Sequence, residues 1–150
     1  MNRDDIAALI PHRGPFLLLD EITAIGDDSV EATYTMRPDD ELWTRIYAGH
    51  YPGNPITPGV LLCEMLFQAS AVLLGRVAKE AGLAGVPVVT RITGAKFKSI
   101  VPPGSTVTIR ATLKERLANA FFMKGDIRCG GKTSLQAEFA VALAEADATA

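Results

Sequence analysis

Alternating hydrophobic and polar positions predict most of the secondary structure of this chain. In the segment 30–37 every second residue is apolar, which is the pattern of a strand with one buried face. Residues 15–26 form an apolar run that ends at a turn and predict another strand. Four strand-like runs follow in the second half of the chain, at 88–98, 105–115, 120–128 and 132–143. The last is the clearest, since its apolar residues share one parity: Leu135, Ala137, Phe139, Val141 and Leu143.

Turn residues separate these late strands from one another. Pro102-Pro103-Gly104 and Gly130-Gly131 are typical of tight connections. Consecutive strands joined by short turns pair side by side, so the pattern predicts an antiparallel sheet.

One long helix is predicted between the early and the late strands. Thr57 is a good N-cap, and Pro58 fits the first turn of a helix that runs to about Glu80 and stops at Gly82. The helix has almost no polar face before Arg76, which predicts burial on most of its sides.

The remaining segments are predicted to be short or irregular. Residues 4–9 favour one small helix, and residues 47–59 are so rich in Gly and Pro that they predict a shaped loop. One buried helix beside one antiparallel sheet is an α+β fold, and we expect residues 1–150 to form a single domain without internal repeats.

Composition and charge narrow the classes of function. Hydrophobic residues make up 48% of the chain, which favours an interface or an apolar channel. The net charge is -2 and no segment is a basic tract, so a nucleic acid is not an expected partner. The two cysteines, Cys63 and Cys129, lack metal-ligand spacing and favour a reducing compartment. No metal site is therefore predicted.

We expect a cytoplasmic protein without a membrane span. The first residues contain acids and no long apolar run, which argues against a secretory signal. The longest apolar segment, near 60–81, is interrupted by Glu64, Gln68 and Arg76.

The candidate catalytic residues are His50 and Glu64. His50 lies between glycines and prolines, which fix the backbone and let a ligand come close, whereas an isolated loop histidine has no special role. Glu64 lies among apolar neighbours at the start of the predicted helix, where burial keeps a carboxyl group protonated; the alternative is an exposed helix acid.

Three further residues are candidates for substrate binding. The N–H groups of Gly59 and Val60 begin the helix without intrahelical partners and can bind a carbonyl oxygen as negative charge builds on it. Gln68 lies one turn beyond Glu64 and either orients its carboxyl group or is an ordinary polar residue.

These groups supply what the elimination of water from a β-hydroxyacyl thioester requires. A base takes the proton beside the carbonyl, N–H donors stabilise the enolate-like oxygen, and an acid protonates the departing hydroxyl. No cofactor is needed. Because histidine and glutamate also serve hydrolases, a thioesterase remains an alternative, as does a non-catalytic acyl-binding subunit.

The chain closely resembles the FabZ-type β-hydroxyacyl-acyl-carrier-protein dehydratases. The resemblance lies in IPHRGPFLLLDEI (10–22), GHYPGNPITPGVLLCEMLFQA (49–69) and KFKSIVPPGSTVTI (96–109), which occur in the family's order. It implies a hotdog fold, with a curved antiparallel sheet wrapped around one long central helix. By position, His50 matches the family's histidine, Glu64 its acid and Gly59 its carbonyl-binding amide. Glutamate at the acid position favours the FabZ type over the FabA type, which has aspartate there.

The resemblance also implies partners. The substrate is carried on the phosphopantetheine arm of acyl carrier protein, and the protein forms a homodimer, in some members a trimer of dimers. Each active site then combines His50 of one chain with Glu64 of the other. The chain departs from the family's usual pattern at Tyr51 and in the bulky segment 65–67, which leaves its acyl chain length and pathway open.

Overall fold

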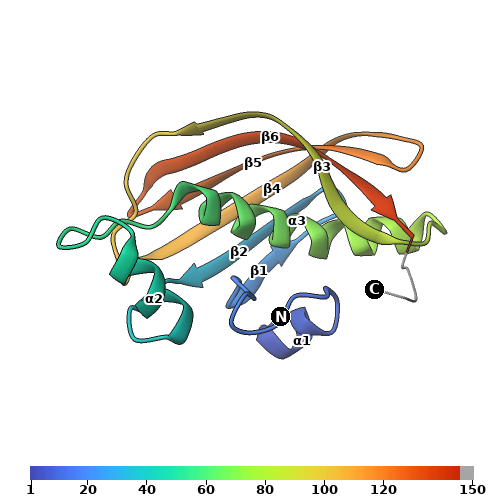
Figure 1. Ribbon diagram of the computed structural model, residues 1–150. Coiled ribbons are helices and arrows are strands. Elements are labelled where there is room, and N and C mark those ends of the chain that lie inside the picture. Colours follow the sequence, from blue (N-terminus) through green and yellow to red (C-terminus); the bar gives the residue numbers. More distant parts are fainter. Residues whose placement is uncertain (146–150) are drawn as a thin grey trace.

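A computed structural model describes residues 1–145 and shows one curved sheet folded around a central helix (Figure 1). The six strands are antiparallel and lie in the order β1-β2-β4-β5-β6-β3. Their bounds are β1 Glu21–Ile25, β2 Ser29–Thr35, β3 Val86–Phe97, β4 Thr106–Leu117, β5 Ala120–Cys129 and β6 Lys132–Ala144. The predicted α+β hotdog arrangement is confirmed.

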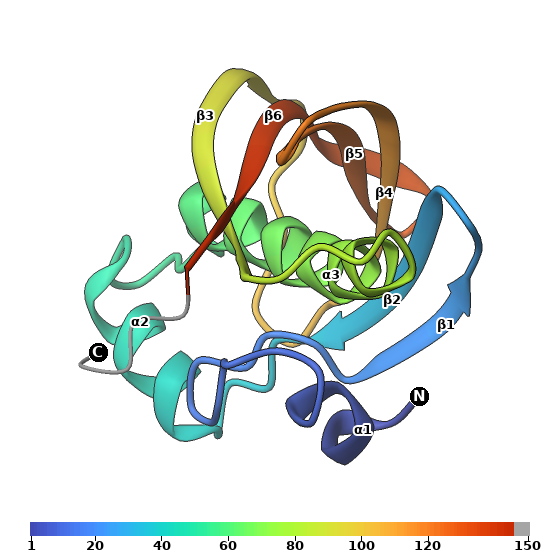
Figure 2. The ribbon, with the colours of Figure 1, turned by 90° about the vertical axis from the view of Figure 1, so that its right-hand side faces the viewer.

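Helix α3 (Gly59–Glu80) lies in the concave face of the sheet, as the view along its axis shows (Figure 2). Its inward residues include Leu62, Met65, Leu66 and Leu73, which are at most 3% exposed. The inward parity predicted for β6 is also confirmed, because Leu135, Ala137, Phe139, Val141 and Leu143 are all buried. Burial of these two apolar surfaces against each other is the main source of stability.

Gly125 of β5 lets the helix approach the sheet closely. A Cβ atom at this position would collide with the Leu66 side chain and would lie 2.5 Å from the carbonyl oxygen of Arg110 on β4. Glycine in a strand interior is otherwise unfavourable, and here it marks the point of closest contact between the two layers.

A second helix, α2 (Glu41–Gly49), corrects the predicted loop at 47–59, whose first three residues are helical. Trp43 and Tyr47 lie one turn apart and are buried, with ring centroids 5.3 Å apart. The Trp43 Nε1 donates to the Tyr34 hydroxyl at 2.7 Å, which ties the helix to β2. These aromatic contacts stabilise a nine-residue helix that would be marginal alone.

Two other elements are shorter than predicted. Only Glu21–Ile25 of the predicted strand 15–26 is regular, because the backbone of residues 16–18 bonds instead to the Gln68 side chain. Helix α1 spans Arg3–Ala7, with Asn2 and Asp5 forming a capping box, rather than residues 4–9.

Helix α3 is also long and apolar enough to cross a membrane. Within the described fold, however, 56% of its most apolar window is buried. The core helix of a globular domain meets the same criteria of length and hydropathy, so this feature does not indicate a membrane span.

Candidate active site

His50 lies at the junction between α2 and the loop that leads to α3. Its backbone N–H donates to the carbonyl of Ile46 at 2.9 Å, which makes it the C-cap of α2. The next residue, Tyr51, has a φ of 58°, and its ring packs edge-on against the imidazole, with centroids 4.7 Å apart. Left-handed backbone in a non-glycine residue is strained and is found where the surrounding structure imposes it, often at functional sites.

The imidazole of His50 has a defined tautomer. Its Nδ1 lies 2.8 Å from the carbonyl oxygen of Ile56. A carbonyl only accepts hydrogen bonds, so in the neutral ring Nδ1 carries the hydrogen and Nε2 has a free lone pair. This is the state in which a histidine can accept a proton from a substrate.

His50 lines a cavity of about 450 Å³ at the start of α3. Gly59 and Val60 line the same cavity, and as the first two helical residues their N–H groups have no intrahelical partners. No side chain caps this end of the helix. The structure therefore brings together the predicted base and the two predicted carbonyl-binding amides.

Thr57 does not cap α3 as predicted. Pro58 is the N-cap residue, and the Thr57 hydroxyl instead lies 2.7 Å from the Tyr47 hydroxyl. Burial raises the pKa of Tyr47, so its phenol stays neutral and keeps this bond. The contact joins α2 to the loop before α3 and leaves the helix N-terminus uncapped.

Phe97, at the end of β3, closes one side of the cavity over Gly59. A Cβ atom on Gly59 would lie 2.6 Å from the Phe97 ring. Glycine at this position thus lets the aromatic ring come close to the helix N-terminus, and a larger residue would have to displace the Phe97 ring.

Glu64 and Gln68 form a second group, one turn apart on α3. The Gln68 Nε2 donates to Glu64 Oε1 at 3.0 Å and to the carbonyl of Phe16 at 2.8 Å, while Gln68 Oε1 accepts from Leu18 N–H at 2.8 Å. Both N–H bonds of the amide are in use, and Gln68 is fully buried. Gln68 therefore has no donor left for a substrate and acts on Glu64 instead.

His12, in the segment before β1, also contacts this group, because its Nε2 lies 3.3 Å from Glu64 Oε1. Arg13 holds this segment in place, because its guanidinium donates to the carbonyls of Ile10 and His12, both at 2.7 Å. Because His12 and Glu64 are far apart in sequence, no local sequence pattern predicts their contact.

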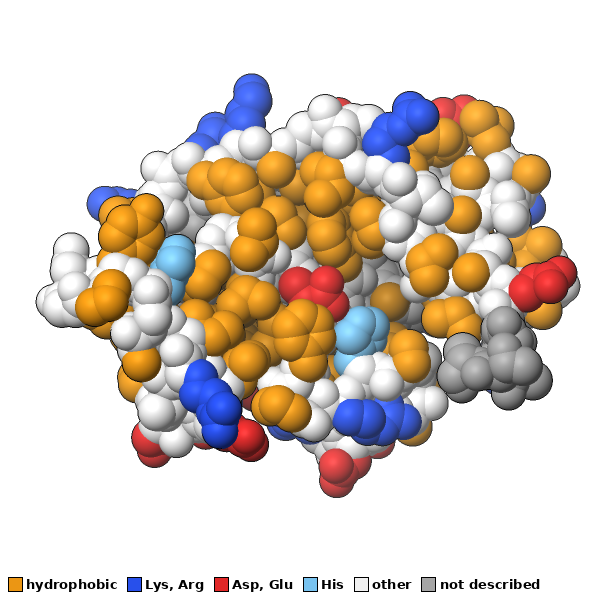
Figure 3. All heavy atoms as spheres, viewed as in Figure 1, with side chains coloured by type: hydrophobic (Ala, Val, Ile, Leu, Met, Phe, Trp, Pro, Cys, Tyr) orange, Lys and Arg blue, Asp and Glu red, His pale blue; other side chains and the backbone are white. Residues whose placement is uncertain are grey.

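His50 and Glu64 do not meet within one chain. Among residues 1–145, no hydrogen bond or ion pair joins them, and Glu64 does not line the cavity that contains His50. Figure 3 shows acidic and histidine side chains set among exposed hydrophobic ones on the face over α3. Among the described residues, the exposed large apolar side chains include Phe16, Val60, Val88, Ile92 and Phe97.

Comparison with known proteins agrees with this arrangement. The family model of the FabA-like domain matches residues 10–138. A curated 3-hydroxyacyl-[acyl-carrier-protein] dehydratase FabZ of Petrotoga mobilis is 31% identical over 95% of this chain and 98% of its own length. The FabZ of Chloroflexus aggregans is 36% identical over 99% of each chain. This chain belongs to the FabZ dehydratase family.

Solved structures share the fold of this FabZ-family chain. The dehydratase heterocomplex ApeI:P from Xenorhabdus doucetiae superimposes with a TM-score of 0.77, at 21% identity, over 94% of this chain and 91% of that chain. A hypothetical thioesterase from Streptococcus pneumoniae, solved with coenzyme A, has a TM-score of 0.65 at 15% identity, over 95% of this chain and 96% of that chain. Identities this low show the common fold alone.

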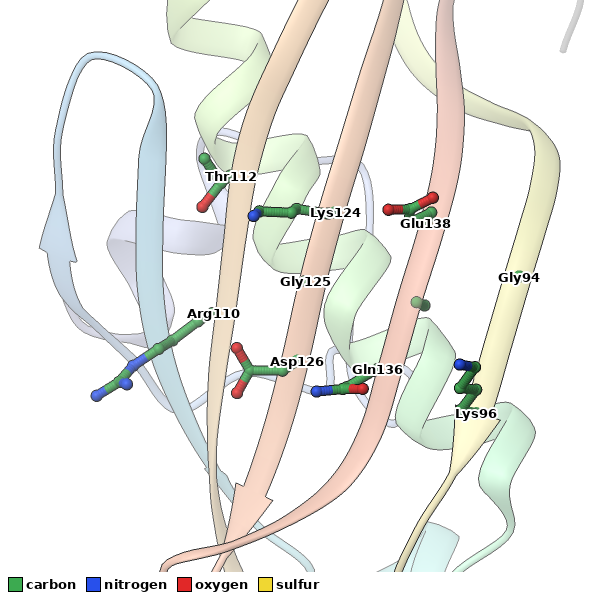
Figure 4. A pocket seen from close by; sticks show the side chains of 10 residues that line it. Gly94, Lys96, Arg110, Thr112, Lys124, Gly125, Asp126, Gln136 and Glu138 are labelled. Carbon is green, nitrogen blue, oxygen red and sulfur yellow. The ribbon is translucent and has the colours of Figure 1, made fainter.

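A second hollow, of about 530 Å³, lies on the outer face of the sheet, away from the residues of the FabZ-family motifs around His50 (Figure 4). Its charges alternate in sign across neighbouring strands: Arg110 faces Asp126, and Lys124 faces Glu138. Such opposite pairs stabilise a solvent-facing sheet. We therefore assign this hollow to the packing of the sheet and not to the chemistry.

The other kinds of chemistry to consider are a metal site and a reactive cysteine. Within residues 1–145 no three His, Cys, Asp or Glu side chains lie so as to hold a metal ion. Cys63, next to Glu64, is buried, and burial raises the pKa of its thiol, which makes it a poor nucleophile at neutral pH. We therefore assign Cys63 to packing.

Proposed function

We propose that this protein eliminates water from a β-hydroxyacyl thioester carried on acyl carrier protein, giving the trans-2-enoyl thioester in fatty-acid or related acyl-chain biosynthesis. The observation that carries the proposal is the geometry of His50, whose Nδ1 is bound to the Ile56 carbonyl and whose Nε2 is free in the cavity at the start of α3. The curated FabZ relatives bear the name of this activity.

In the proposed reaction, the Nε2 of His50 takes the proton on the carbon beside the thioester carbonyl. Negative charge then builds on the carbonyl oxygen. The free N–H groups of Gly59 and Val60, at the positive end of the α3 dipole, bind that oxygen. Because these donors are fixed by the helix, they need no reorganisation as the charge forms.

Glu64 is the proposed acid. Its Oε1 is occupied by Gln68, and none of the described residues bonds to its Oε2. A proton on Oε2 passes to the β-hydroxyl group as the carbon–oxygen bond breaks, and water leaves. After this step His50 carries one added proton and Glu64 has lost one. Transfer of one proton from His50 to Glu64 therefore restores the starting state of the enzyme.

The proposed chemistry needs no cofactor or metal, because the groups that move protons are all side chains of the protein. The acyl group arrives on the phosphopantetheine arm of acyl carrier protein. Lys98 lines the cavity and is exposed at its side, where a positive charge would attract an acidic carrier protein. Lys96 lies instead on the outer hollow of the sheet.

We propose that the protein works as a homodimer. Strand β3 is at the edge of the sheet and is exposed along most of its length, with Val88, Val89 and Ile92 each at least 37% exposed. A long apolar edge strand is prone to pair with another strand. Pairing of two β3 edges would cover this surface and supply the partner's Glu64 to the His50 cavity. Three such dimers could assemble further into a trimer of dimers. Sedimentation would distinguish this assembly from a single dimer by its mass.

We also propose that the protein is located in the cytoplasm. The core position of α3 and the family's role in acyl-chain synthesis support a protein that acts in the compartment of acyl carrier protein. The net charge of -2 gives no support for a nucleic-acid partner.

The test is incubation with β-hydroxyacyl carrier-protein substrates of graded chain length, followed by mass spectrometry of the products. We expect an enoyl thioester that is one water lighter than the substrate. Release of the free acid would show a thioesterase, and absence of turnover at every chain length would show a non-catalytic acyl-binding subunit. Either result would overturn the proposed function.

A further inference from the structure

His12 and Glu64 meet although they are 52 positions apart in sequence. The contact joins His12 Nε2 to Glu64 Oε1 at 3.3 Å, and both side chains are partly buried, at 27% and 25% exposure. Gln68 donates to the same oxygen at 3.0 Å. One carboxyl oxygen therefore has two nitrogen neighbours, whereas the other has no bond to any described residue.

The second nitrogen of His12 decides which tautomer this contact uses. His12 Nδ1 is buried and has no hydrogen-bond partner among the described residues. A hydrogen on Nδ1 would be a buried donor without an acceptor, which is costly. The favoured ring is neutral, with its hydrogen on Nε2, the nitrogen that lies 3.3 Å from Glu64 Oε1. This is the opposite tautomer to that of His50, whose Nδ1 donates to the Ile56 carbonyl.

The segment that carries His12 is held firmly. Arg13 bonds to the carbonyls of Ile10 and His12, and Gln68 bonds to the backbone of Phe16 and Leu18. The histidine donor is thus fixed relative to α3 by the same amide that contacts Glu64.

We infer that His12 is a positioning residue: its contact with Glu64 Oε1, beside the Gln68 hydrogen bond, restrains the carboxyl group so that Oε2 is the oxygen that carries the transferred proton. The inference rests on the proposed function of Glu64 as the acid. When Glu64 releases its proton to the departing hydroxyl, its carboxyl group becomes negative. The Gln68 donor on Oε1 and the polar Nε2 of His12 beside it stabilise that charge as it forms, which lowers the barrier without any contact between His12 and the substrate.

The first test compares two substitutions of the same residue. His12→Leu removes the donor and puts an apolar side chain of similar size in its place, whereas His12→Gln keeps an N–H donor at a similar reach. With 3-hydroxybutyryl-acyl carrier protein as the probe, we expect His12→Leu to lower kcat by about 10- to 100-fold, the effect of losing a hydrogen bond to a charged group. KM should change little, and His12→Gln should restore most of kcat.

A kcat of His12→Leu equal to that of the parent would overturn the inference. Equal losses in both variants would also overturn it, because they would show a role in packing alone. If the parent itself gives no enoyl product, the proposed function fails, and that failure is visible before any variant is compared.

The second test needs no variant and no turnover. Nitrogen-15 NMR of the histidine side chains distinguishes a ring protonated on Nδ1 from one protonated on Nε2. The parent protein has two histidines, and we expect His50 in the Nδ1–H form and His12 in the Nε2–H form. His12 found in the Nδ1–H form would contradict the proposed bond to Glu64, whatever the activity of the protein.

Discussion

The two proposed catalytic side chains share one design. Each uses one polar atom to bind the scaffold and leaves the other free. His50 binds the Ile56 carbonyl through Nδ1, and Glu64 binds Gln68 through Oε1. The free atoms, Nε2 and Oε2, are the ones that the proposed reaction uses. Fixing one atom of a small rigid group also fixes the direction of the other, which is the geometric requirement for proton transfer.

Replacing His50 tests the base. His50→Ala should lower kcat by roughly a hundredfold to ten-thousandfold, because the proton beside the carbonyl loses its acceptor. The fold should survive, since His50 lies at the end of α2 and outside the core. Asn54→Ala, an exposed change in the same loop, is the matched control and should keep parental kcat. A folded His50→Ala protein with near-parental activity would exclude His50 as the base.

Replacing Glu64 tests the acid. Glu64→Gln keeps the size of the side chain but has no acidic proton, so we expect a loss in kcat of at least about a hundredfold. Glu80→Gln is the matched control on the same helix, because Glu80 is exposed and, among the described residues, bonds only to Arg76 at 2.9 Å. Circular dichroism should show both variants folded. If Glu64→Gln stays within a few-fold of the parent, Glu64 only orients the substrate and water is the acid.

At the scale of elements, α3 has two functions that constrain each other. It fills the core with its inward residues and carries the amides of Gly59 and Val60 together with Glu64 on its more exposed side. The sheet must therefore hold the helix at a fixed depth. Gly125 of β5 sets that depth, because any larger residue would meet Leu66 and the backbone of β4.

A pair of glycine substitutions measures this constraint. Gly125→Ala should lower the free energy of unfolding by about 1–3 kcal/mol, since the added methyl group overpacks the contact between α3 and the sheet. Gly94→Ala in β3 is the matched control, because a Cβ atom there meets nothing within 4 Å, and it should stay within about 0.5 kcal/mol. Urea unfolding followed by fluorescence of Trp43 gives both values. Equal stabilities would show that the helix can move away from the sheet at little cost.

At the scale of the whole molecule, the single chain does not contain the complete proposed site. His50 and the helix amides line one cavity, whereas Glu64 is hydrogen-bonded to Gln68 and contacts His12 elsewhere. The exposed apolar edge of β3 is the proposed interface through which a second copy would complete the site.

Mixing two inactive variants tests the shared site. A dimer of one His50→Ala chain and one Glu64→Ala chain has one site that lacks both groups and one that is intact. Random reassortment makes half of the dimers mixed, so refolding the two variants together should restore about a quarter of parental activity. Mass spectrometry under native conditions must confirm the mixed dimers. Activity near zero in confirmed mixed dimers would mean that both residues of a site belong to one chain.

The sequence by itself determined the elements and the residue types of the site. Alternation of apolar residues predicted the strands, because side chains of a strand point to opposite faces in turn. The apolar run with Thr57-Pro58-Gly59 before it predicted α3 to within two residues, and the Gly- and Pro-bounded loop and the helix start singled out His50 and Glu64. The resemblance to FabZ dehydratases then connected these residues with one reaction.

Only the tertiary structure decided how these residues are held. Helix α2 depends on Trp43 and Tyr47 finding partners in β2 and in the loop before α3, and the contact of His12 with Glu64 joins segments far apart in sequence. The irregular path of residues 16–18 likewise follows from their bonds to Gln68. Local patterns report periodicity and burial, whereas a hydrogen bond between distant segments exists only once packing has brought its donor and acceptor together.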